Sequence, residues 1–540
     1  MIKQVSHLVH LMRAGLVFAR HDVLPPEQLA LAPTPVRLLF KMAKLVAGKP
    51  AKTASSNLSS GLNGALEELG PSYIKLGQFL ATRPDFVGKA RASELADLQD
   101  KLAPFAQDIA EAEVEKQLNR PLKEVFGKFS TAIAAASIAQ VHKAELHQPT
   151  TNQDGKKSSG QPLTEVAVKI LRPNVKRRFK KDLDSFFFAA RMMERWIEPL
   201  RRLKPVEAVN VLARSVDMEM DLRFEAAAMS EMAENTKDDP GFRIPEIDWQ
   251  HTTGRVLVSE WVDGIALNEP EKLKAAGVDL KKLAENVMQS FLRHAIRDGF
   301  FHADMHQGNL FADKKGNLIA VDFGITGRLS MRDRLVLAEV LYGFLNKDYL
   351  RVSQVHFDAG YVPQSQDVHI FAQSLRAIGE PIMDKRAEDI SMGQLLGQLF
   401  EGTERFSMQT QPQLILLQKT MVVVEGVARS LDPQFNMWTA SEPVVSEWIK
   451  KRLGPQGKLE DAADGAATLG RFAGAFPELL QEVGNSLHIV SDIASKGGIG
   501  LDQKTTDALA ASQASHGRSG RLALWVGAVS LAVIAISQIF

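Results

Sequence analysis

The chain contains no cysteine, and this absence removes several chemistries at once. Disulfide bonds, thiolate metal sites and thiol nucleophiles are all excluded. An excess of charge is lacking as well, because 65 lysines and arginines stand against 64 acidic residues and the formal net charge is +1. Nucleic-acid-binding domains are usually strongly basic, so the composition gives no indication of a nucleic-acid partner. The 540 residues are 45% apolar, which is normal for a large globular protein.

The N-terminus lacks the sustained apolar run of a signal peptide, since its basic residues are scattered through a helical pattern. The other end carries such a run. Residues 522–540 contain no charge, and as a helix these nineteen residues would be about 28 Å long, close to the roughly 30 Å hydrocarbon core of a bilayer. We therefore predict a transmembrane helix there. A buried core helix is the alternative, and it is disfavoured because residues 510–520 are polar and linker-like.

Arg518 and Arg521 stand just before this apolar segment. Positive flanks stay on the cytoplasmic side of a membrane, so we expect the rest of the chain on that side. A single membrane anchor per molecule is one interpretation, and a homodimer that supplies more membrane helices is the other.

The most informative stretch runs from His302 to Asn309 and continues at Asp322-Phe323-Gly324. Asn309 follows Asp304 by five residues, and Asp322 follows thirteen residues later. Protein kinases use this order: the first Asp orients the nucleophile, and the Asn and the second Asp hold magnesium between phosphates. We therefore predict Asp304 as a catalytic residue, with Asn309 and Asp322 as ligands of Mg²⁺. A metal site formed by His302, Asp304 and His306 is the alternative.

The residues between these ligands read as two short strands, 309–311 and 318–321, joined by a turn. Upstream, Val166-Ala167-Val168-Lys169 is an alternating strand that ends in a cation. It matches the lysine with which kinases bridge nucleotide phosphates to a helix glutamate.

A phosphate-binding loop is expected before this strand, and here its glycines are replaced by alanines. A Cβ atom restricts positive φ and keeps the backbone farther from a ligand, so the nucleotide should be held differently. An alanine-rich bend packed against a sheet is the structural alternative. The residues predicted to contact the ATP cofactor, together with Lys169, are Ile133, Ala134, Ala135, Ala136, Ser137, Ile138, Ala139, Gln140 and Val141.

Four features together resemble the UbiB family, the atypical protein-kinase-like proteins required for ubiquinone (coenzyme Q) biosynthesis. They are Lys75-Leu76-Gly77-Gln78, the alanine-rich loop, Glu219-Met220-Asp221 with Glu225, and His302–Asn309 before Asp322. The resemblance implies a kinase-like fold that binds ATP with magnesium. It also implies an N-terminal extension that carries Lys-x-Gly-Gln and folds over the place where a protein substrate would lie.

Around Lys75 the sequence predicts a helix that restarts after Pro71. Lys75 and Gln78 are three residues apart and share a face. On its own this pattern is typical of a solvated amphipathic helix, and the resemblance makes both side chains site residues.

Acidic residues for the two lysines come from a helix expected around residues 216–235. Glu219 and Asp221 would project about 200° apart on this helix, and Glu225 lies six residues beyond Glu219. Since one glutamate cannot easily serve both lysines, we assign Glu225 to Lys169. Glu219 and Asp221 are predicted to face Lys75 and Gln78, which completes the predicted catalytic set.

Two sequence features that protein kinases use around a polypeptide acceptor are absent. Ala303 stands where most protein kinases have an arginine that binds a phosphorylated activation loop, and no Ala-Pro-Glu follows Gly324. Only residues 325–330 separate Gly324 from an apolar-periodic helix that begins near Met331. A segment this short gives little platform for a polypeptide. The sequence therefore favours ATP hydrolysis or phosphorylation of a small molecule over protein phosphorylation.

The predicted fold class is α+β, a two-lobed protein-kinase-like fold. Its expected parts are a helical N-terminal extension at 1–125, an N-lobe with a helical insertion at 126–265, a C-lobe at 266–500, a linker at 501–521 and the membrane anchor at 522–540. The insertion, within residues 173–203, is rich in lysine and arginine. A solvated charged face is the simpler interpretation, and contact with anionic lipid is the alternative.

Three functions follow as hypotheses. The first is a membrane-anchored kinase or ATPase that uses Mg-ATP to support ubiquinone biosynthesis. Its partners would be the lipid bilayer, isoprenoid quinone precursors and the enzymes that modify them. The second is a protein kinase that regulates those enzymes, which the short segment after Gly324 disfavours. The third is a non-catalytic scaffold for nucleotide and lipid, which the intact set Lys169, Asp304, Asn309 and Asp322 disfavours.

Overall fold

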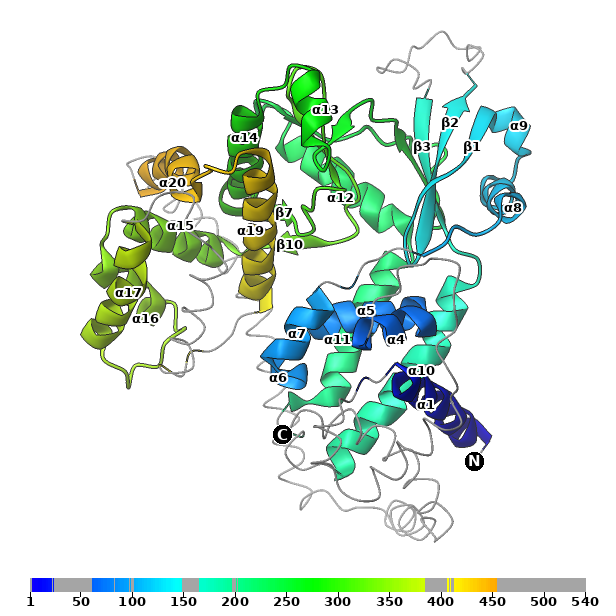
Figure 1. The fold of residues 1–540 in the computed structure, drawn as a ribbon, viewed down its shortest axis with the longest axis horizontal. Helices are drawn as coiled ribbons and strands as arrows, with labels where there is room; N and C mark the ends of the chain where they lie inside the picture. Colours follow the sequence, from blue (N-terminus) through cyan, green and yellow to red (C-terminus); the bar gives the residue numbers. More distant parts are fainter. Residues whose placement is uncertain are drawn as a thin grey trace, which may run out of the picture. The chain divides into compact units, whose positions relative to one another are not determined.

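A computed structural model describes residues 2–21, 23, 61–81, 83–96, 98, 102–147, 165–196, 201, 203–383, 406, 408 and 412–453. The chain divides into two compact units, one formed by residues 1–442 with 525–540 and the other by residues 443–524. All of the described elements lie in the first unit except residues 443–453 of the last helix. They are a mixture of helices and small sheets (Figure 1).

A set of short helices precedes the first strand. They are α1 (Ile2–Arg20), α4 (Leu62–Leu69), α5 (Pro71–Ala81), α6 (Pro84–Val87), α7 (Lys89–Ala96), α8 (Gln107–Leu118) and α9 (Leu122–Val125). The predicted new helix at Pro71 is confirmed, because α4 ends at Leu69 with Gly70 as its C-cap and α5 begins at Pro71. Gly70 has a φ of 96°, a conformation that glycine adopts without a steric penalty. Proline suits the first turn of the next helix, where its missing N–H is not needed.

A four-stranded antiparallel sheet forms the core of the N-terminal lobe, in the order β1-β2-β3-β5. The strands are β1 (Phe126–Ala135), β2 (Ala139–Leu146), β3 (Glu165–Leu171) and β5 (Val256–Glu260). Val166, Val168 and Ile170 of β3 are fully buried against α8 and the neighbouring strands. Side chains alternate across a strand, so Lys169 projects from the face of the sheet opposite this core.

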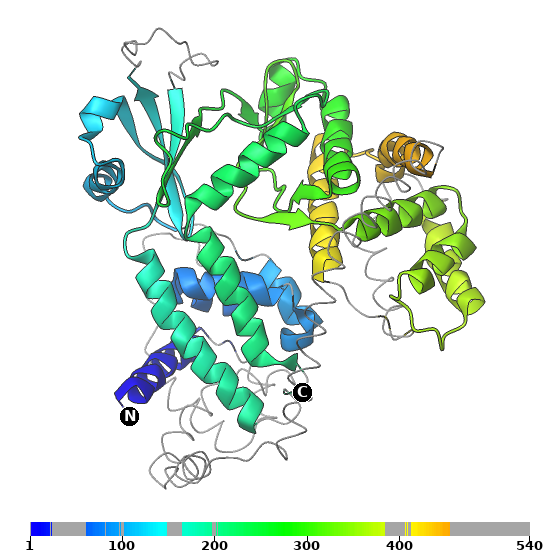
Figure 2. The same ribbon diagram turned by 180° about the vertical axis from the view of Figure 1, so that it is seen from behind.

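Three helices connect β3 to β5, namely α10 (Val175–Trp196), α11 (Pro205–Glu219) and α12 (Leu222–Asn235), as Figure 2 shows. The prediction of a single helix around residues 216–235 is wrong, because the helix is interrupted at Met220 and Asp221. Asp221 has an extended backbone, with φ −136° and ψ 100°, and its side chain accepts a hydrogen bond from the backbone N–H of Arg223. This is an N-cap, which satisfies an otherwise unpaired donor at the start of α12.

The remaining described elements surround two further small sheets. The strands are β4 (Phe242–Arg243), β6 (Ile265–Ala266), β7 (Phe300–His302), β8 (Leu310–Ala312), β9 (Leu318–Ala320) and β10 (Thr326–Arg328). The helices are α13 (Pro270–Ala275), α14 (Leu280–Leu292) with the π-helical turn Arg293–Asp298, α15 (Met331–Leu345), α16 (Tyr349–Asp358), α17 (Val368–Met383), α19 (Pro412–Leu431) and α20 (Met437–Leu453). The predicted hairpin before Asp322 is confirmed, since β8 and β9 pair antiparallel.

Among the described helices, none has both the length and the apolar character needed to cross a bilayer. The membrane helix predicted at 522–540 and the linker predicted at 501–521 lie outside the described residues.

The short segment after Gly324 ends in a complete capping box at Ser330. The Ser330 hydroxyl accepts from the backbone N–H of Asp333, and the Asp333 carboxylate accepts from the backbone N–H of Ser330.

Replacing Ser330 by alanine should lower the free energy of unfolding by about 1 kcal/mol, because the helix loses its N-cap acceptor. Urea denaturation measures this change, with Ser330→Thr as the control that keeps the hydroxyl. Equal stability of the alanine variant and the wild type would contradict the assignment.

Candidate active site

Lys169 of β3 is shared between two carboxylates. Its Nζ atom lies 2.7 Å from Glu225 Oε1 and 2.9 Å from Asp322 Oδ1. Glu225 comes from the first turn of α12, and Asp322 follows β9. The predicted pairing of Glu225 with Lys169 is confirmed. One ammonium group therefore connects the β-sheet, a helix and the Asp-Phe-Gly turn, three elements that are far apart in the sequence.

Two carboxylates share a single ammonium group here, and this arrangement shifts the pKa of all three side chains. Burial alone would lower the pKa of Lys169, but Asp322 and Glu225 outweigh it and raise that pKa. Burial also works against the charged form of Asp322, yet the nearby Lys169 lowers the Asp322 pKa well below its usual range. Burial raises the pKa of Glu225 to about 7 in spite of Lys169. When both carboxylates are ionised, the single ammonium group leaves a surplus negative charge in this partly desolvated place, which favours the binding of a further cation.

Three hydrogen bonds fix the loop that carries Asp304. His302 Nε2 donates to Val321 O at 3.0 Å, and His302 Nδ1 accepts from Asp304 N at 3.0 Å. Asn309 Nδ2 then donates to Asp304 O at 3.1 Å. Burial lowers the pKa of His302, which keeps the ring neutral in the tautomer that these bonds require. The Asp304 side chain itself remains 41% exposed and therefore accessible to a reactant.

The metal site considered for His302, Asp304 and His306 is excluded. Both ring nitrogens of His302 already bond to the backbone, so neither is available to a metal. Within the described residues, no group of three or more histidine, aspartate or glutamate side chains could hold a metal ion.

Asn309 and Asp322 fit the weaker requirement of magnesium, which usually takes one or two protein ligands and obtains the rest from phosphates and water. Val321 N donates to Asn309 O at 2.9 Å across the hairpin, so Asp322 follows directly beside Asn309. The Asn309 amide uses Nδ2 for Asp304 O, which leaves its Oδ1 for a cation. The Asp322 side chain is 43% exposed, so a cation can reach its carboxylate from solvent.

Asp322 adopts a φ of 59°, a left-handed conformation that is rare for a residue with a side chain. Phe323 is buried next to it, with its ring centroid 4.5 Å from that of His302. Packing of this aromatic ring holds the turn in place while the carboxylate of Asp322 reaches Lys169. Backbone strain of this kind is concentrated at functional sites, where the surrounding structure over-determines it.

The alanine-rich loop is a tight turn between β1 and β2, and Arg172 holds it in place. Arg172 Nε and Nη2 donate to Ala136 O at 3.0 and 2.9 Å, and Arg172 N donates to Ile138 O at 2.8 Å. Arg172 is not among the predicted site residues, because no periodicity or spacing marks it. Its one local signal is its place directly after Leu171, the last residue of β3.

Gln140 has a different environment from the one predicted for a nucleotide ligand. Its side chain is buried, accepts from Phe105 N at 2.8 Å and lies 2.9 Å from His142 Nε2. His142 Nδ1 in turn lies 2.9 Å from Ser130 O, and burial lowers the pKa of His142. The Gln140 amide is therefore engaged inside the lobe, where it ties the segment before α8 to the alanine-rich loop.

Lys75 and Glu219 form a second ion pair. Lys75 Nζ lies 2.7 Å from Glu219 Oε2, and each side chain is only 10% exposed. Gly77 allows α5 to lie this close to its neighbours, because a Cβ there would come within 2.6 Å of Leu66 and 2.7 Å of Leu98. Gln78 is half-buried on the same helix.

Asp221, predicted to face Lys75 and Gln78, forms an ion pair with its neighbour Arg223. Its carboxylate accepts from Arg223 Nη2 at 2.6 Å and from Arg223 Nε at 2.9 Å, and the bond to Arg223 lowers the Asp221 pKa. Asp221 is the cap of α12, so it holds the start of the helix that presents Glu225 to Lys169.

A lysine paired with a helix glutamate, an Asp-Phe-Gly turn and a His-x-Asp loop define a kinase-like protein. Comparison with known families agrees. The ABC1 atypical kinase-like domain matches residues 97–356, and the UbiB helical domain matches residues 375–436.

Several relatives carry the name "Probable protein kinase UbiB", among them proteins from Marinobacter nauticus and Vibrio vulnificus. The protein from Marinobacter nauticus is 38% identical over 461 residues, covering 84% of this chain and 81% of that one. The protein from Vibrio vulnificus is 37% identical over 485 residues, covering 89% of this chain and 86% of that one. The chain therefore belongs to the UbiB family.

The raised pKa of Glu225 predicts a pH dependence of stability. Its pKa is about 7 in the folded protein against an ordinary value of 4.5, so the folded state binds more protons between these values than the unfolded chain. This contribution to the free energy of unfolding is fully present below the lower value and is lost as the pH rises through the higher one. We expect the stability of the wild type relative to Glu225→Gln to fall between about pH 4.5 and about pH 7. Denaturant titrations across this range measure the difference, and a constant difference would contradict the assignment.

Proposed function

We propose that the protein is an atypical kinase or ATPase that uses Mg-ATP to support ubiquinone biosynthesis. The observation that carries this proposal is the single ammonium group of Lys169 in contact with both Glu225 and Asp322. Kinases require this lysine–glutamate pair and the Asp-Phe-Gly carboxylate to be in place together before phosphoryl transfer.

Each residue has a chemical role in this proposal. ATP with magnesium, when bound, supplies the transferable phosphoryl group. Lys169 would neutralise phosphate charge, while Asn309 Oδ1 and the Asp322 carboxylate would hold the metal. Asp304 is the exposed carboxylate beside them, and it would accept a hydrogen bond from the attacking hydroxyl or water and so orient it.

Several features favour hydrolysis or a small acceptor over a polypeptide. The segment after Gly324 forms β10, paired with β7, and α15 begins at Met331. Helix α5 carries Lys75, which is tied to Glu219 six residues before Glu225. The N-terminal helices are thus anchored beside the helix that supplies the Lys169 partner, where a protein substrate would compete with them.

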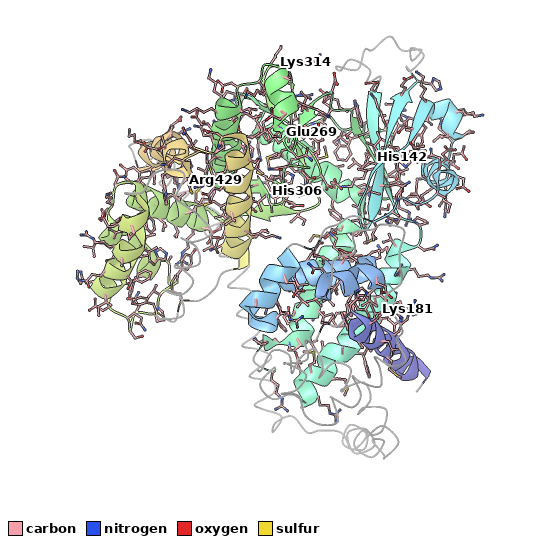
Figure 3. The ribbon with its side chains drawn as sticks, in the orientation of Figure 1. His142, Lys181, Glu269, His306, Lys314 and Arg429 are labelled. Atoms are coloured by element: carbon pink, nitrogen blue, oxygen red, sulfur yellow. The ribbon has the colours of Figure 1, made fainter. Side chains whose placement is uncertain are left out.

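A lipophilic quinone precursor is the acceptor or cargo that best suits a membrane-anchored member of this family. The apolar segment 522–540 supports the anchor, with the catalytic body on the cytoplasmic side of a bacterial inner membrane. Exposed basic residues of α10 are available to anionic lipid, and one of them, Lys181, is marked in Figure 3. The enzymes of ubiquinone biosynthesis and a second copy of the chain remain proposed partners.

A protein kinase that regulates those enzymes is the second candidate, and the name carried by the relatives favours it. A scaffold that binds nucleotide without turnover is the third, and the ordered loop at Asp304 weighs against it.

Asp304→Asn separates these functions. Purified protein in anionic-lipid vesicles should release phosphate from ATP, and the variant should be slower by about 100-fold or more because it loses the proton acceptor. Nucleotide binding, measured in parallel, should be retained. Equal release by both proteins would remove Asp304 from catalysis, and radiolabel transferred to a biosynthetic enzyme would favour the protein kinase.

Deletion of residues 520–540 tests the anchor. The shortened protein should move from the membrane fraction to the supernatant, because the uncharged segment that matches the bilayer is gone. Fractionation of cell lysates followed by immunoblotting measures this. Continued membrane association would contradict a single C-terminal anchor.

A further inference from the structure

Residue 303 joins the end of β7 to the catalytic carboxylate, and both of its backbone polar groups have partners from elsewhere in the chain. Ala303 N donates to Ile325 O at 3.0 Å, directly after the Asp-Phe-Gly turn. On the other side, Thr420 Oγ1 lies 3.2 Å from Ala303 O. Ala303 is only 6% exposed and Thr420 only 1%, so water does not replace these contacts readily.

Thr420 belongs to α19, a helix that lies along the catalytic region. Figure 1 shows α19 beside β10, and the helix packs against α14 and β10. Its buried face is apolar except at Thr420 and Glu425, and it consists of Leu417, Thr420, Met421, Val424, Glu425, Val427, Ala428 and Leu431. A hydroxyl in such a face needs a hydrogen-bond acceptor.

A second contact lies farther along the same helix. Gln307 Nε2 donates to Ser430 Oγ at 2.6 Å. Ser430 follows Thr420 by ten residues, which corresponds to about 15 Å along a helix. The two contacts therefore hold the loop at residues on both sides of Asp304, and His306 between them is marked in Figure 3.

We infer that α19 is a permanent brace for the catalytic loop and that Thr420 is its main positioning residue. Many kinases hold this loop through an arginine and a phosphorylated activation segment. Here the arginine is replaced by Ala303, and the segment after Gly324 is short. The hydroxyl of Thr420 supplies the missing support from a helix 117 residues away in the chain. This inference rests on the proposed catalytic role of Asp304.

The Thr420 hydroxyl also lies 2.8 Å from Leu416 O, the ordinary partner of a threonine within its own helix. One hydroxyl proton is thus shared between the helix and the loop. If only the helix contact mattered, removing the hydroxyl would leave the loop unchanged. Lys169, Glu225 and Asp322 lie on other elements, and the loop contributes only Asn309 to the proposed Mg-ATP site, so a loop displacement should slow turnover more than it weakens nucleotide binding.

The test compares Thr420→Val with Thr420→Ser. Valine keeps the branched shape without the hydroxyl, and serine restores the hydroxyl. Val422→Thr is the matched control, because it makes the reverse exchange at an exposed position of the same helix. We expect kcat for phosphate release to fall about 10- to 100-fold in Thr420→Val. Nucleotide Kd should change much less than kcat, and both Thr420→Ser and Val422→Thr should retain activity.

Amide hydrogen exchange of the nucleotide-free protein gives a readout independent of turnover. Peptides covering residues 303–309 should exchange faster in Thr420→Val than in the wild type, with no change around Lys169. Unchanged exchange and unchanged kcat in that variant would overturn the inference. If Thr420→Val does not fold, Ser430→Ala at an exposed position of α19 provides the test instead. Faster amide exchange around Gln307 in that variant supports the brace, and exchange as slow as in the wild type rejects it.

Failure of the proposed function gives a different result. If Asp304→Asn releases phosphate as fast as the wild type, the catalytic assignment is wrong whatever Thr420 does. If Asp304→Asn is inactive and Thr420→Val is fully active, the catalytic assignment stands and the brace is rejected.

Discussion

The site depends on one positive charge placed between two negative ones. Lys169 can contact Glu225 and Asp322 together only because β3 presents it away from the apolar core, α12 starts at a capped Asp221, and the Asp-Phe-Gly turn accepts a strained backbone at Asp322. Breaking a buried ion pair leaves an uncompensated charge, which costs about 3–5 kcal/mol. Each of the three elements therefore fixes the other two.

Much of this arrangement could be predicted because it is encoded locally. The alternation around Lys169, the turn between the strands that flank residues 313–317 and the spacing of Asp304, Asn309 and Asp322 each lie within a short stretch of sequence. Such patterns determine strands and turns with little help from the rest of the fold. The pairing of Glu225 with Lys169 also follows, because one glutamate cannot easily serve two lysines.

The incorrect helix prediction and the missed residues have different physical causes, the first local and the second tertiary. One continuous helix would have carried Glu219 and Asp221 together, whereas an Asp side chain that bonds to the backbone interrupts it. Arg172 beside the alanine-rich loop has only its place after β3 as a local signal, and Thr420 beside Ala303 has none. Their partners are 36 and 117 residues away, and only the folded chain brings them together.

The Lys169–Glu225 contact and the Asp-Phe-Gly turn are assembled around the same ammonium group, and this has a pharmacological consequence. Some kinase inhibitors bind conformations in which the glutamate helix has swung outward or the Asp-Phe-Gly turn has flipped. A ligand shifts a conformational equilibrium only by its difference in affinity for the two states. Here such a compound must first separate Lys169 from Glu225 or from Asp322, so compounds that accept the assembled site are the better starting point for selective chemical probes.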